Sequence, residues 1–362
     1  MKSSINQNSS ENESRVTQQN VQQGDTTKSN SEELDYMNNL LHKKFPSFFE
    51  NFELLDYTDV NDTGIIFKGL VKTKINKNKL FSFKFYNEMK NGQKNLIWKH
   101  YEIINQKKLH HKNISEMLAF HKMNDDNYFS VSEFGEHGNL NDFIHKFLKK
   151  NFVSETFVNY LAKQILEALN YMHQKKIYHM DINKHNIVVD NELNIKLINF
   201  SSTINFESHQ PNDLLKFPIK GTGYFMPPEI LKGEPIEIKY GTKVDLYSLG
   251  VTLYNLAFGS YPFDLDKVKK FDYDKISEHL DKTSLEFPED IKISKKFENF
   301  LKNILEKDYL KRYSIKDAMN DPWIKGWDFI NEEKENTKIN YNFIVRLMYN
   351  HIHQFNEYIK SE

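Results

Sequence analysis

The hydrophobic pattern changes part-way along the chain, and this change restricts the fold more than any other feature. Residues 52–90 contain three short runs rich in β-branched and aromatic residues, FELLDY, GIIFKGL and LFSFKFY, which polar stretches separate. These runs predict strands, and residues 94–109 predict one helix. From about residue 139 helical spacing dominates, broken only by the strand-like segments NIVVD and IKLINF. Strands followed by helices predict an α+β protein.

Three flanking regions differ from this central part. Residues 1–33 are rich in Ser, Asn, Gln and Glu, so they bury too little apolar area to offset chain entropy, and we expect a disordered tail. Residues 34–51 place apolar side chains near helical spacing, with an interruption at Pro46, which predicts an amphipathic capping helix. Residues 328–362 predict a C-terminal helical extension that either docks on the domain or binds a partner.

Charge and cysteine content narrow the classes of function. The chain has 49 Lys and Arg against 50 Asp and Glu, so we expect no nucleic acid and no membrane as partner. It has no cysteine, which excludes disulfides and thiolate metal sites and fits a reducing compartment. No apolar stretch reaches the length of a membrane span, and the N-terminus lacks a signal-peptide core. We therefore expect a soluble, cytoplasmic protein, with the nucleus as an alternative.

An acid and an amide lie five residues apart in the segment HMDINKHN, as Asp181 and Asn186. A loop of this kind can present a proton acceptor and a metal ligand to one reacting oxygen. Further along the chain come NFS at 199–201, GTGYFMPPE at 221–229 and DLYSLG at 245–250. The order and spacing of these segments resemble the eukaryotic protein kinase family, whose signatures include H-R-D-L-x-x-x-N, D-F-G and A-P-E.

The resemblance extends over residues 52–327. Lys84 in FSFK matches the family's phosphate-binding lysine, and Glu102 matches the glutamate that orients it. Glu229 and Arg312 match the buried ion pair that ties the activation segment to the helical lobe. The resemblance implies a bilobal protein-kinase fold, with a small β-rich N-lobe (52–134) that has one main helix and a larger, mainly helical C-lobe (135–327). The Gly-Thr-Gly-Tyr stretch is closer to Ser/Thr than to Tyr kinases.

The same resemblance assigns the residues of a catalytic and nucleotide-binding site. Asp181 would accept the proton of the substrate hydroxyl, and Asn186 and Asn199 would hold Mg²⁺ or Mn²⁺ for ATP. Asn183 stands where a Ser/Thr kinase has a lysine beside the transferring phosphate. The other expected ATP contacts come from the phosphate loop, the purine-binding positions and the hinge: Gly64, Ile66, Ser82, Lys84, Ser132, Glu133, Gly135 and Val188.

Several departures from the family's pattern weaken phosphoryl transfer. Asn199 replaces the metal-binding aspartate, and a neutral amide is a poorer ligand for Mg²⁺ than a carboxylate. Asn183 replaces the loop lysine, and of the phosphate-loop glycines only Gly64 remains. Met180 replaces the arginine that receives an activation-segment phosphate in many relatives. Gln106 stands where the family has an apolar residue that joins the lobes, so we expect a looser active alignment.

Three functions remain open from the sequence. A pseudokinase would bind ATP weakly or without metal and act as a scaffold or allosteric partner in signalling. A divergent Ser/Thr protein kinase would still transfer the ATP γ-phosphate to a protein hydroxyl, because Lys84, Glu102, Asp181 and Asn186 are retained. A small-molecule kinase or an unrelated binding module is the third. The pseudokinase is favoured because several departures fall in one phosphate-binding region, and the sequence identifies neither a protein substrate nor a signalling partner.

Overall fold

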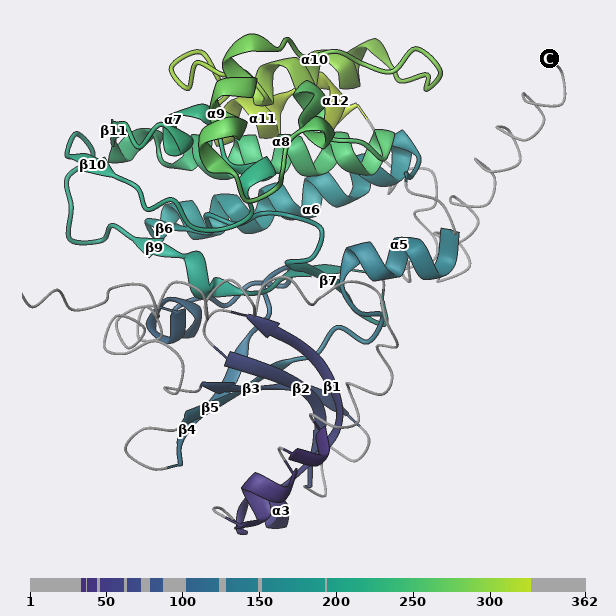
Figure 1. Cartoon of the computed structure of the whole chain (residues 1–362), viewed down its shortest axis with the longest axis vertical. Coiled ribbons are helices and arrows are strands. Elements are labelled where there is room, and N and C mark those ends of the chain that lie inside the picture. The colour runs from purple at the N-terminus through teal and green to yellow at the C-terminus, as the bar shows by residue number, and fades with distance from the viewer. Residues whose placement is uncertain are drawn as a thin grey trace, which may run out of the picture. The chain divides into compact units, whose positions relative to one another are not determined.

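In the computed structural model, the described residues form two compact units (Figure 1). The first unit contains the described residues up to Val60 together with Ile65–Phe83, and the second contains Asn61–Gly64 together with the described residues from Lys84 onward. The predicted tail and the predicted C-terminal extension lie outside the described residues. These are 34–36, 38–43, 46–61, 64–72, 79–86, 102–123, 128–148, 152–192 and 194–326.

In the described part of the chain, five strands form one sheet, in the order β1-β2-β3-β5-β4. β4 and β5 run antiparallel, with Met117 opposite Ser132 and Lys122 opposite Tyr128. Between β3 and β4 in the chain, residues 102–107 are helical, and residues 94–101 of the predicted helix lie outside the described part. The strand bounds are β1 (Phe52–Asn61), β2 (Gly64–Val71), β3 (Leu80–Tyr86), β4 (Met117–Lys122) and β5 (Tyr128–Glu133).

Aromatic side chains fill the core of the first unit. A short helix, α3 (Phe48–Asn51), follows a turn at Pro46 and Ser47. The Phe48 ring lies 5.0 Å from that of Phe52 and 6.2 Å from that of Phe83, between ring centroids. Edge-to-face and tilted aromatic contacts of this kind add stability beyond the area they bury. They fix the helical residues of this unit onto its strands.

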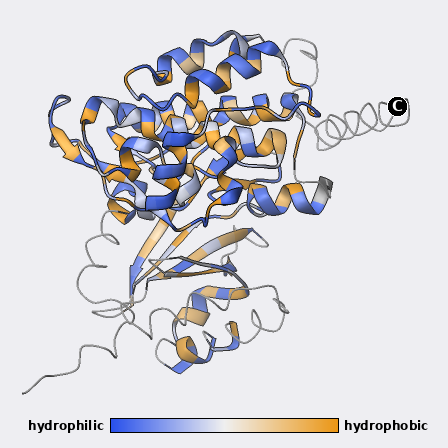
Figure 2. Ribbon diagram, turned by 45° about the horizontal axis from the view of Figure 1, so that its top comes forward, coloured by the Kyte–Doolittle hydropathy of each residue, from blue (hydrophilic) through white to orange (hydrophobic). Residues whose placement is uncertain are grey.

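The second unit is mainly helical, as the pattern after residue 139 predicts. Figure 2 shows hydrophilic and hydrophobic residues alternating along its helices, which is typical of helices with one face on a core. The helix bounds are α5 (Leu140–Leu148), α6 (Glu155–Gln174), α7 (Pro228–Leu231), α8 (Thr242–Phe258), α9 (Tyr273–Lys282), α10 (Lys295–Ile304), α11 (Ile315–Asn320) and α12 (Pro322–Lys325). None of the described helices has both the length and the apolar character needed to cross a membrane.

Helix α8 is the centre of this unit, packed against α6, α10 and α11 (Figure 1). All its residues from Val244 to Phe258 are buried, so it lacks a solvent-facing stripe. A Cβ on Gly250 would lie 2.9 Å from side-chain atoms of Ile304 and Leu305, so glycine allows α8 to approach α10 closely. The helix ends at Gly259, whose φ of 73° is left-handed and favours glycine.

Short strands and single 3₁₀ turns connect these helices. Among the residues that the structure describes, three two-stranded antiparallel pairs occur, and their strands are too short to have a detectable sequence period. The pairs are β6 (Ile177–Tyr178) with β9 (Ile204–Asn205), β7 (Ile187–Val189) with β8 (Ile195–Leu197), and β10 (Leu214–Lys216) with β11 (Pro235–Glu237). The turns are η1 (Phe200–Ser202), η2 (Gly223–Phe225), η3 (Ile238–Tyr240) and η4 (Pro262–Lys267).

Candidate functional site

A single buried carboxylate fixes the loop that contains Asp181. Asp245 on α8 accepts hydrogen bonds from His173 Nε2 at 2.8 Å and from the backbone N–H groups of His179 at 2.9 Å and Met180 at 2.7 Å. Burial alone would raise the pKa of Asp245, but the hydrogen bond and charge of His173 and the nearby His179 bring it below its ordinary value. Met180 has a left-handed φ of 66°, which costs a non-glycine residue energy. Asp245 therefore holds the loop in a strained shape.

Neutral donors surround the carboxylate of Asp181. Its Oδ1 accepts hydrogen bonds from Asn183 Nδ2 at 3.0 Å and from the backbone N–H of Thr222 at 3.2 Å. Its Oδ2 accepts from Asn186 Nδ2 at 2.8 Å. These bonds orient the carboxylate in a buried position. Asn183 thus binds Asp181, where the family's lysine would bring a positive charge.

The chain of hydrogen bonds continues from Asn186 to Asn199 and Ser201. Asn199 Nδ2 donates to Asn186 Oδ1 at 3.0 Å, and Ser201 Oγ donates to Asn199 Oδ1 at 2.9 Å. Each side-chain oxygen that the sequence assigns to a metal therefore already accepts a hydrogen bond. Asn199 holds this position with a left-handed φ of 63°, which asparagine tolerates better than most residues.

This donor set does not fit a divalent metal of the kind kinases use. Mg²⁺ prefers carboxylate oxygens and near-ideal octahedral geometry, whereas positions 186 and 199 offer two neutral amides joined to each other. Among the described residues, no three His, Asp or Glu side chains gather in a group that could hold a metal ion. The N–H of Asn199 donates to Asn186 and so joins the two side chains directly. With an aspartate at position 199, a cation would have to lie between the two side chains to join them.

The predicted lysine–glutamate pair is formed within the second unit. Lys84 Nζ on β3 lies 2.5 Å from Glu102 Oε1 at the start of the helical residues 102–107, and both side chains are buried. Gln106, one turn later, is also buried, and its Nε2 donates to the backbone oxygen of Ser115 at 3.0 Å. Because this amide has a partner, the polar residue does not leave the helix with an unsatisfied group. The hydrogen bond of Gln106 to Ser115 gives no sign of the looser active alignment expected from a polar residue at this position.

The same helix is joined to the segment after Asn199. Asn105 is fully buried, donates to Thr203 Oγ1 at 3.0 Å and accepts from Asn205 Nδ2 at 3.3 Å. Lys108 and Glu207 add an exposed ion pair at 2.6 Å. Sequence reasoning missed Asn105, although a polar residue beside Gln106 on a buried helical face was a signal that could have identified it. The hydroxyl residues in the first turn of this segment, Ser201, Ser202 and Thr203, are buried.

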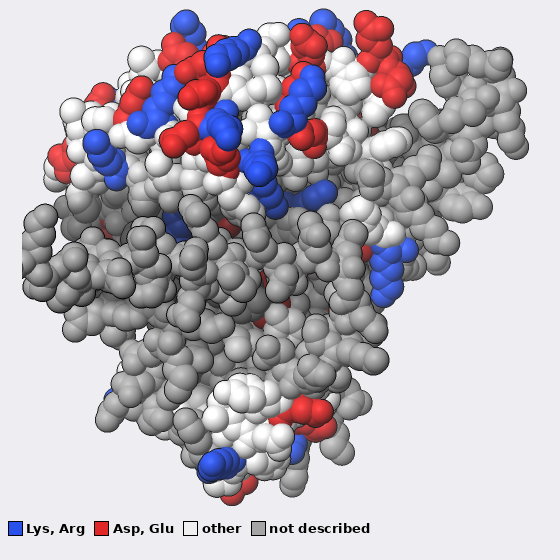
Figure 3. Space-filling model, viewed as in Figure 1, with Lys and Arg blue, Asp and Glu red and all other residues white. Residues whose placement is uncertain are grey.

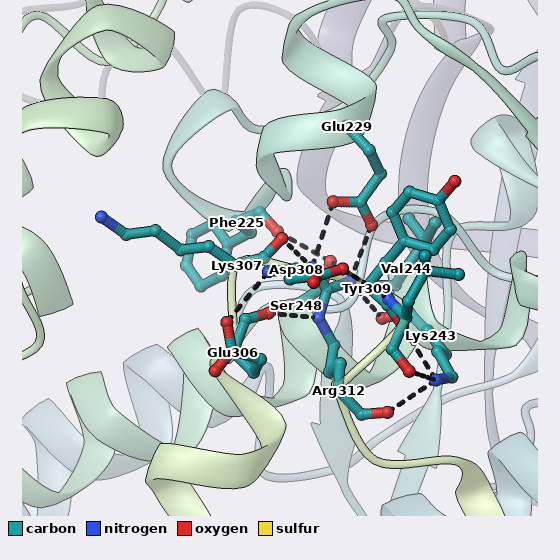
Figure 4. Close-up of polar contacts among 11 residues, drawn as sticks. Phe225, Glu229, Lys243, Val244, Ser248, Glu306, Lys307, Asp308, Tyr309 and Arg312 are labelled. Atoms are coloured by element: carbon teal, nitrogen blue, oxygen red, sulfur yellow. Dashed lines mark hydrogen bonds and ion pairs between the residues drawn. The ribbon is translucent and has the colours of Figure 1, made fainter.

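Glu229 and Arg312 form the buried ion pair that the resemblance implies, and the contact is bidentate (Figure 4). Arg312 NH1 donates to Glu229 Oε1 at 2.7 Å and NH2 donates to Oε2 at 3.0 Å, and both residues are buried. The guanidinium also donates to the backbone oxygens of Lys243, Glu306 and Lys307. All five donor positions of Arg312 can be used in this geometry, so the charge is buried without unpaired N–H groups.

The positions predicted to contact a nucleotide are all buried or half-buried. In the second unit, a Cβ on Gly135 would lie 2.4 Å from Val188 Cβ, and a Cβ on Gly64 would lie 2.2 Å from the Phe85 carbonyl oxygen, so both positions require glycine. Gly64 therefore has a packing role besides any role in binding phosphate. The remaining residues are half-buried: Ser132 and Glu133 on β5, and, in the first unit, Ile66 on β2 and Ser82 on β3.

Three hydrogen bonds to Lys196 and Glu116 hold Glu133 within the second unit. Its Oε2 accepts hydrogen bonds from Lys196 Nζ at 3.0 Å and from the Glu116 backbone N–H at 3.1 Å. Its backbone N–H donates to the Glu116 carbonyl oxygen at 3.1 Å. The main chain at Glu133 is thus rigidly placed, as a residue that contacts a ligand through its backbone must be.

Comparison with known proteins agrees with this arrangement. The model of the protein kinase domain matches residues 63–324, which is most of the chain. The chain belongs to the protein kinase family. A bilobal α+β kinase fold accounts for the sheet of the first five strands and for the helices that follow. Protein kinases in general use ATP and a divalent metal.

The relatives of this kinase domain are Ser/Thr protein kinases. It is 29% identical over 276 residues to "Serine/threonine-protein kinase TIO" of Arabidopsis thaliana, which is 76% of this chain and 19% of that protein. It is 32% identical over 162 residues to "Serine/threonine-protein kinase par-4" of Caenorhabditis briggsae (45% and 24%), and 26% identical over 270 residues to "Serine/threonine-protein kinase pak-2" of Caenorhabditis elegans (74% and 48%). The matched part covers less than half the length of each of these relatives.

Proposed function

We propose that this protein kinase domain is a pseudokinase that binds ATP weakly, does so without a divalent metal, and acts as a scaffold or allosteric partner in signalling. The observation that carries the proposal is the hydrogen-bonded chain from Asp181 through Asn186 and Asn199 to Ser201. It satisfies the two metal-ligand positions with amide N–H and hydroxyl donors. A site organised in this way needs no cation to keep its shape.

The loss of the metal bears mainly on the chemical step. A bound metal stabilises the charge that develops on the transferred phosphoryl group, and this is worth several kcal/mol. Losing it lowers the rate by about a thousandfold or more. Asn183 adds to this loss, because its amide binds Asp181 and supplies no positive charge. The site is better suited to holding a nucleotide than to moving its phosphate.

The intact Lys84–Glu102 pair supports nucleotide binding. In the family this lysine holds the α/β-phosphates of ATP, and the glutamate orients the lysine. In this chain, Lys84 Nζ lies 2.5 Å from Glu102 Oε1. A buried pair that served only stability could be replaced by apolar residues at little cost. We therefore assign to Lys84 the main charged contact with the phosphates of ATP.

A thermal-shift titration with ATP tests this proposal. A ligand at 100 times its dissociation constant stabilises the folded state by about 2.7 kcal/mol, so ATP should raise the unfolding temperature. Because the proposed binding needs no metal, we expect the same rise in EDTA as with Mg²⁺ or Mn²⁺. Lys84→Met should abolish the shift. Lys79→Met, the same change at an exposed lysine before the same strand, is the control and should keep it. A shift that requires the metal contradicts metal-free binding, and no shift at millimolar ATP would leave only the scaffold function.

An active but divergent Ser/Thr protein kinase is the alternative. The short Lys84–Glu102 distance and the oriented carboxylate of Asp181 favour it, since both belong to the family's catalytic arrangement. Phosphotransfer from labelled ATP to a protein hydroxyl separates the two functions. Clear turnover by the native chain that Lys84→Met abolishes would replace the pseudokinase with the kinase. For either function we propose a cytoplasmic location and a protein partner, in keeping with the cysteine-free, charge-balanced composition.

A further inference from the structure

A nucleotide base is uncharged, so hydrogen-bond donors and acceptors must recognise it. Charge does not single out such a place, because on the described part of the face in Figure 3 Lys and Arg side chains mostly lie beside Asp and Glu. The edge of an adenine ring offers a 6-amino donor and, next to it, a ring-nitrogen acceptor. A matching site must present an acceptor and a donor, and the residues around Glu133 in the second unit do so.

Ser115 lies beside the carbonyl group of Glu133. Its Oγ donates a hydrogen bond to the Glu133 carbonyl oxygen at 3.3 Å, and the residue is only 2% exposed. The main chain of Ser115 is fixed from two sides. Its N–H donates to the Leu197 carbonyl oxygen at 2.9 Å, and its carbonyl oxygen accepts from Gln106 Nε2 at 3.0 Å. The polar residue at position 106 thus helps to hold the Ser115 hydroxyl in place.

Both oxygens of this contact can accept a further hydrogen bond. A carbonyl oxygen has two lone pairs, and a hydroxyl group has one donor hydrogen and two lone pairs. The hydroxyl hydrogen of Ser115 bonds to Glu133, and no described residue donates to the hydroxyl oxygen. The two oxygens lie 3.3 Å apart. One amino nitrogen can therefore donate a hydrogen to each of them at the ordinary distance of about 3 Å.

The donor of this site is the backbone N–H of Gly135, two residues further along the chain. Gly135 is buried, and within the described part of the chain its N–H has no hydrogen-bond partner. A Cβ at this position would lie 2.4 Å from Val188 Cβ, so only glycine lets the main chain lie directly against Val188. Buried N–H groups are nearly always paired in folded proteins. A buried N–H without a protein partner indicates a place for an acceptor on a ligand.

We propose that Ser115 makes the nucleotide site selective for a 6-aminopurine. One amino hydrogen bonds to the Glu133 carbonyl oxygen, the other bonds to Ser115 Oγ, and the neighbouring ring nitrogen accepts from the Gly135 N–H. A 6-oxo group would instead place a third oxygen against these two, and Ser115 could donate to it only by giving up its bond to Glu133. A buried polar group that loses its partner costs free energy, so the site rejects such a base. The inference rests on the proposed function and deepens it, since it names the part of ATP that the site recognises.

Thermal-shift titrations of the full chain in EDTA with three nucleotides test this role. The probes are ATP, purine riboside 5′-triphosphate, which has hydrogen in place of the amino group, and inosine 5′-triphosphate, which has an oxygen there. The concentration dependence of the shift gives each dissociation constant. We expect the native chain to bind ATP about 25-fold more tightly than purine riboside triphosphate, at about fivefold for each amino hydrogen bond, and inosine triphosphate no better than that analogue. Ser115→Ala should weaken ATP binding about fivefold and leave the binding of purine riboside triphosphate unchanged.

Two further variants separate recognition of the base from stability. Ser115→Cys keeps the volume of the side chain, but its thiol is a weak donor and acceptor, so it should weaken ATP binding as Ser115→Ala does. Ser248→Ala is the matched control, because Ser248 on α8 is also buried and its hydroxyl donates to the Phe225 carbonyl oxygen at 2.7 Å. It should leave all three affinities unchanged. Each shift is measured against the same variant without nucleotide, which also checks that the variant folds.

Three results would count against the proposal. Equal binding of ATP and the two analogues by the native chain overturns it, and so does tighter binding of inosine triphosphate than of ATP. An equal loss of all three affinities in the Ser115 variants also overturns it, because Ser115 would then act only through stability. The absence of a shift with any nucleotide would instead contradict ATP binding itself, so failure of the proposed function can be told apart from failure of this inference.

Discussion

Replacing Asn199 with aspartate should make the stability of this domain depend on a divalent cation. In the native chain, Asn199 Nδ2 donates to Asn186 Oδ1 at 3.0 Å. Aspartate has the same shape but no N–H, so two acceptor oxygens would face each other at that distance. One lost hydrogen bond and one unpaired buried acceptor together cost about 1–3 kcal/mol in the free energy of unfolding. Mg²⁺ placed between the two oxygens would offset that cost.

Urea denaturation in EDTA and in Mg²⁺ measures this effect. We expect Asn199→Asp to be about 1–3 kcal/mol less stable than the native chain in EDTA. Mg²⁺ at 100 times its dissociation constant should then restore about 2.7 kcal/mol. The native chain should be equally stable in both solutions. Asn194→Asp is the control, since the Nδ2 of Asn194 has only a 3.5 Å contact with Glu192 on an exposed turn.

Two results would refute the reasoning. Asn199→Asp could be as stable as the native chain in EDTA, which would mean that the bond to Asn186 contributes nothing. Alternatively, Mg²⁺ could stabilise the native chain as much as the variant, which would mean that the two amides already hold a cation. Either result removes the main support for metal-free nucleotide binding.

Two further predictions concern stability. Glu229→Gln should lower the free energy of unfolding, measured by urea denaturation, by about 3–5 kcal/mol, because it leaves Arg312 buried without its anion. The control Lys267→Gln, at an exposed ion pair, should cause no measurable change. A small effect at Glu229 would show that the backbone oxygens alone stabilise the buried Arg312. Burial lowers the pKa of His179 and of His185 below the ordinary 6.5, so both imidazoles bind protons less readily in the folded chain than in the unfolded one. The unfolding temperature should therefore be highest above about pH 6.5 and fall as the solution is acidified, and a flat profile from pH 8 to about pH 5 would contradict this.

The sequence could predict those parts of the site that depend on motif spacing. The positions of Lys84 and Glu102 in the family's pattern predict a pair, and the atoms lie 2.5 Å apart. The loop with Asp181 and Asn186 is likewise short enough that its two side chains meet by local geometry. The change from strand-like to helical period predicts the α+β class for the same reason, because each period is a local property.

Contacts between distant segments could not be predicted in this way. Asn105 and Thr203 are 98 residues apart, and nothing in either neighbourhood specifies the other. The close approach of Gly223 to the carbonyl oxygen of Lys270 depends on the path of the chain after α8, which the local pattern does not define. The hydrogen bond from Asn199 to Asn186 could not be predicted either. The sequence shows that position 199 is an asparagine, but it does not show whether the side-chain oxygen or the N–H faces Asn186.

The bond between Asn105 and Thr203 links two elements whose positions would otherwise vary separately. Glu102 and Asn105 lie on the same helical turn, so the helix cannot carry Glu102 away from Lys84 without also breaking the contact with Thr203. A displacement of either element therefore strains the contacts of the other, and we expect the two to shift together. A protein that binds the displaced segment would lower the population with the Lys84–Glu102 pair, and by linkage ATP would oppose that protein's binding by the same factor.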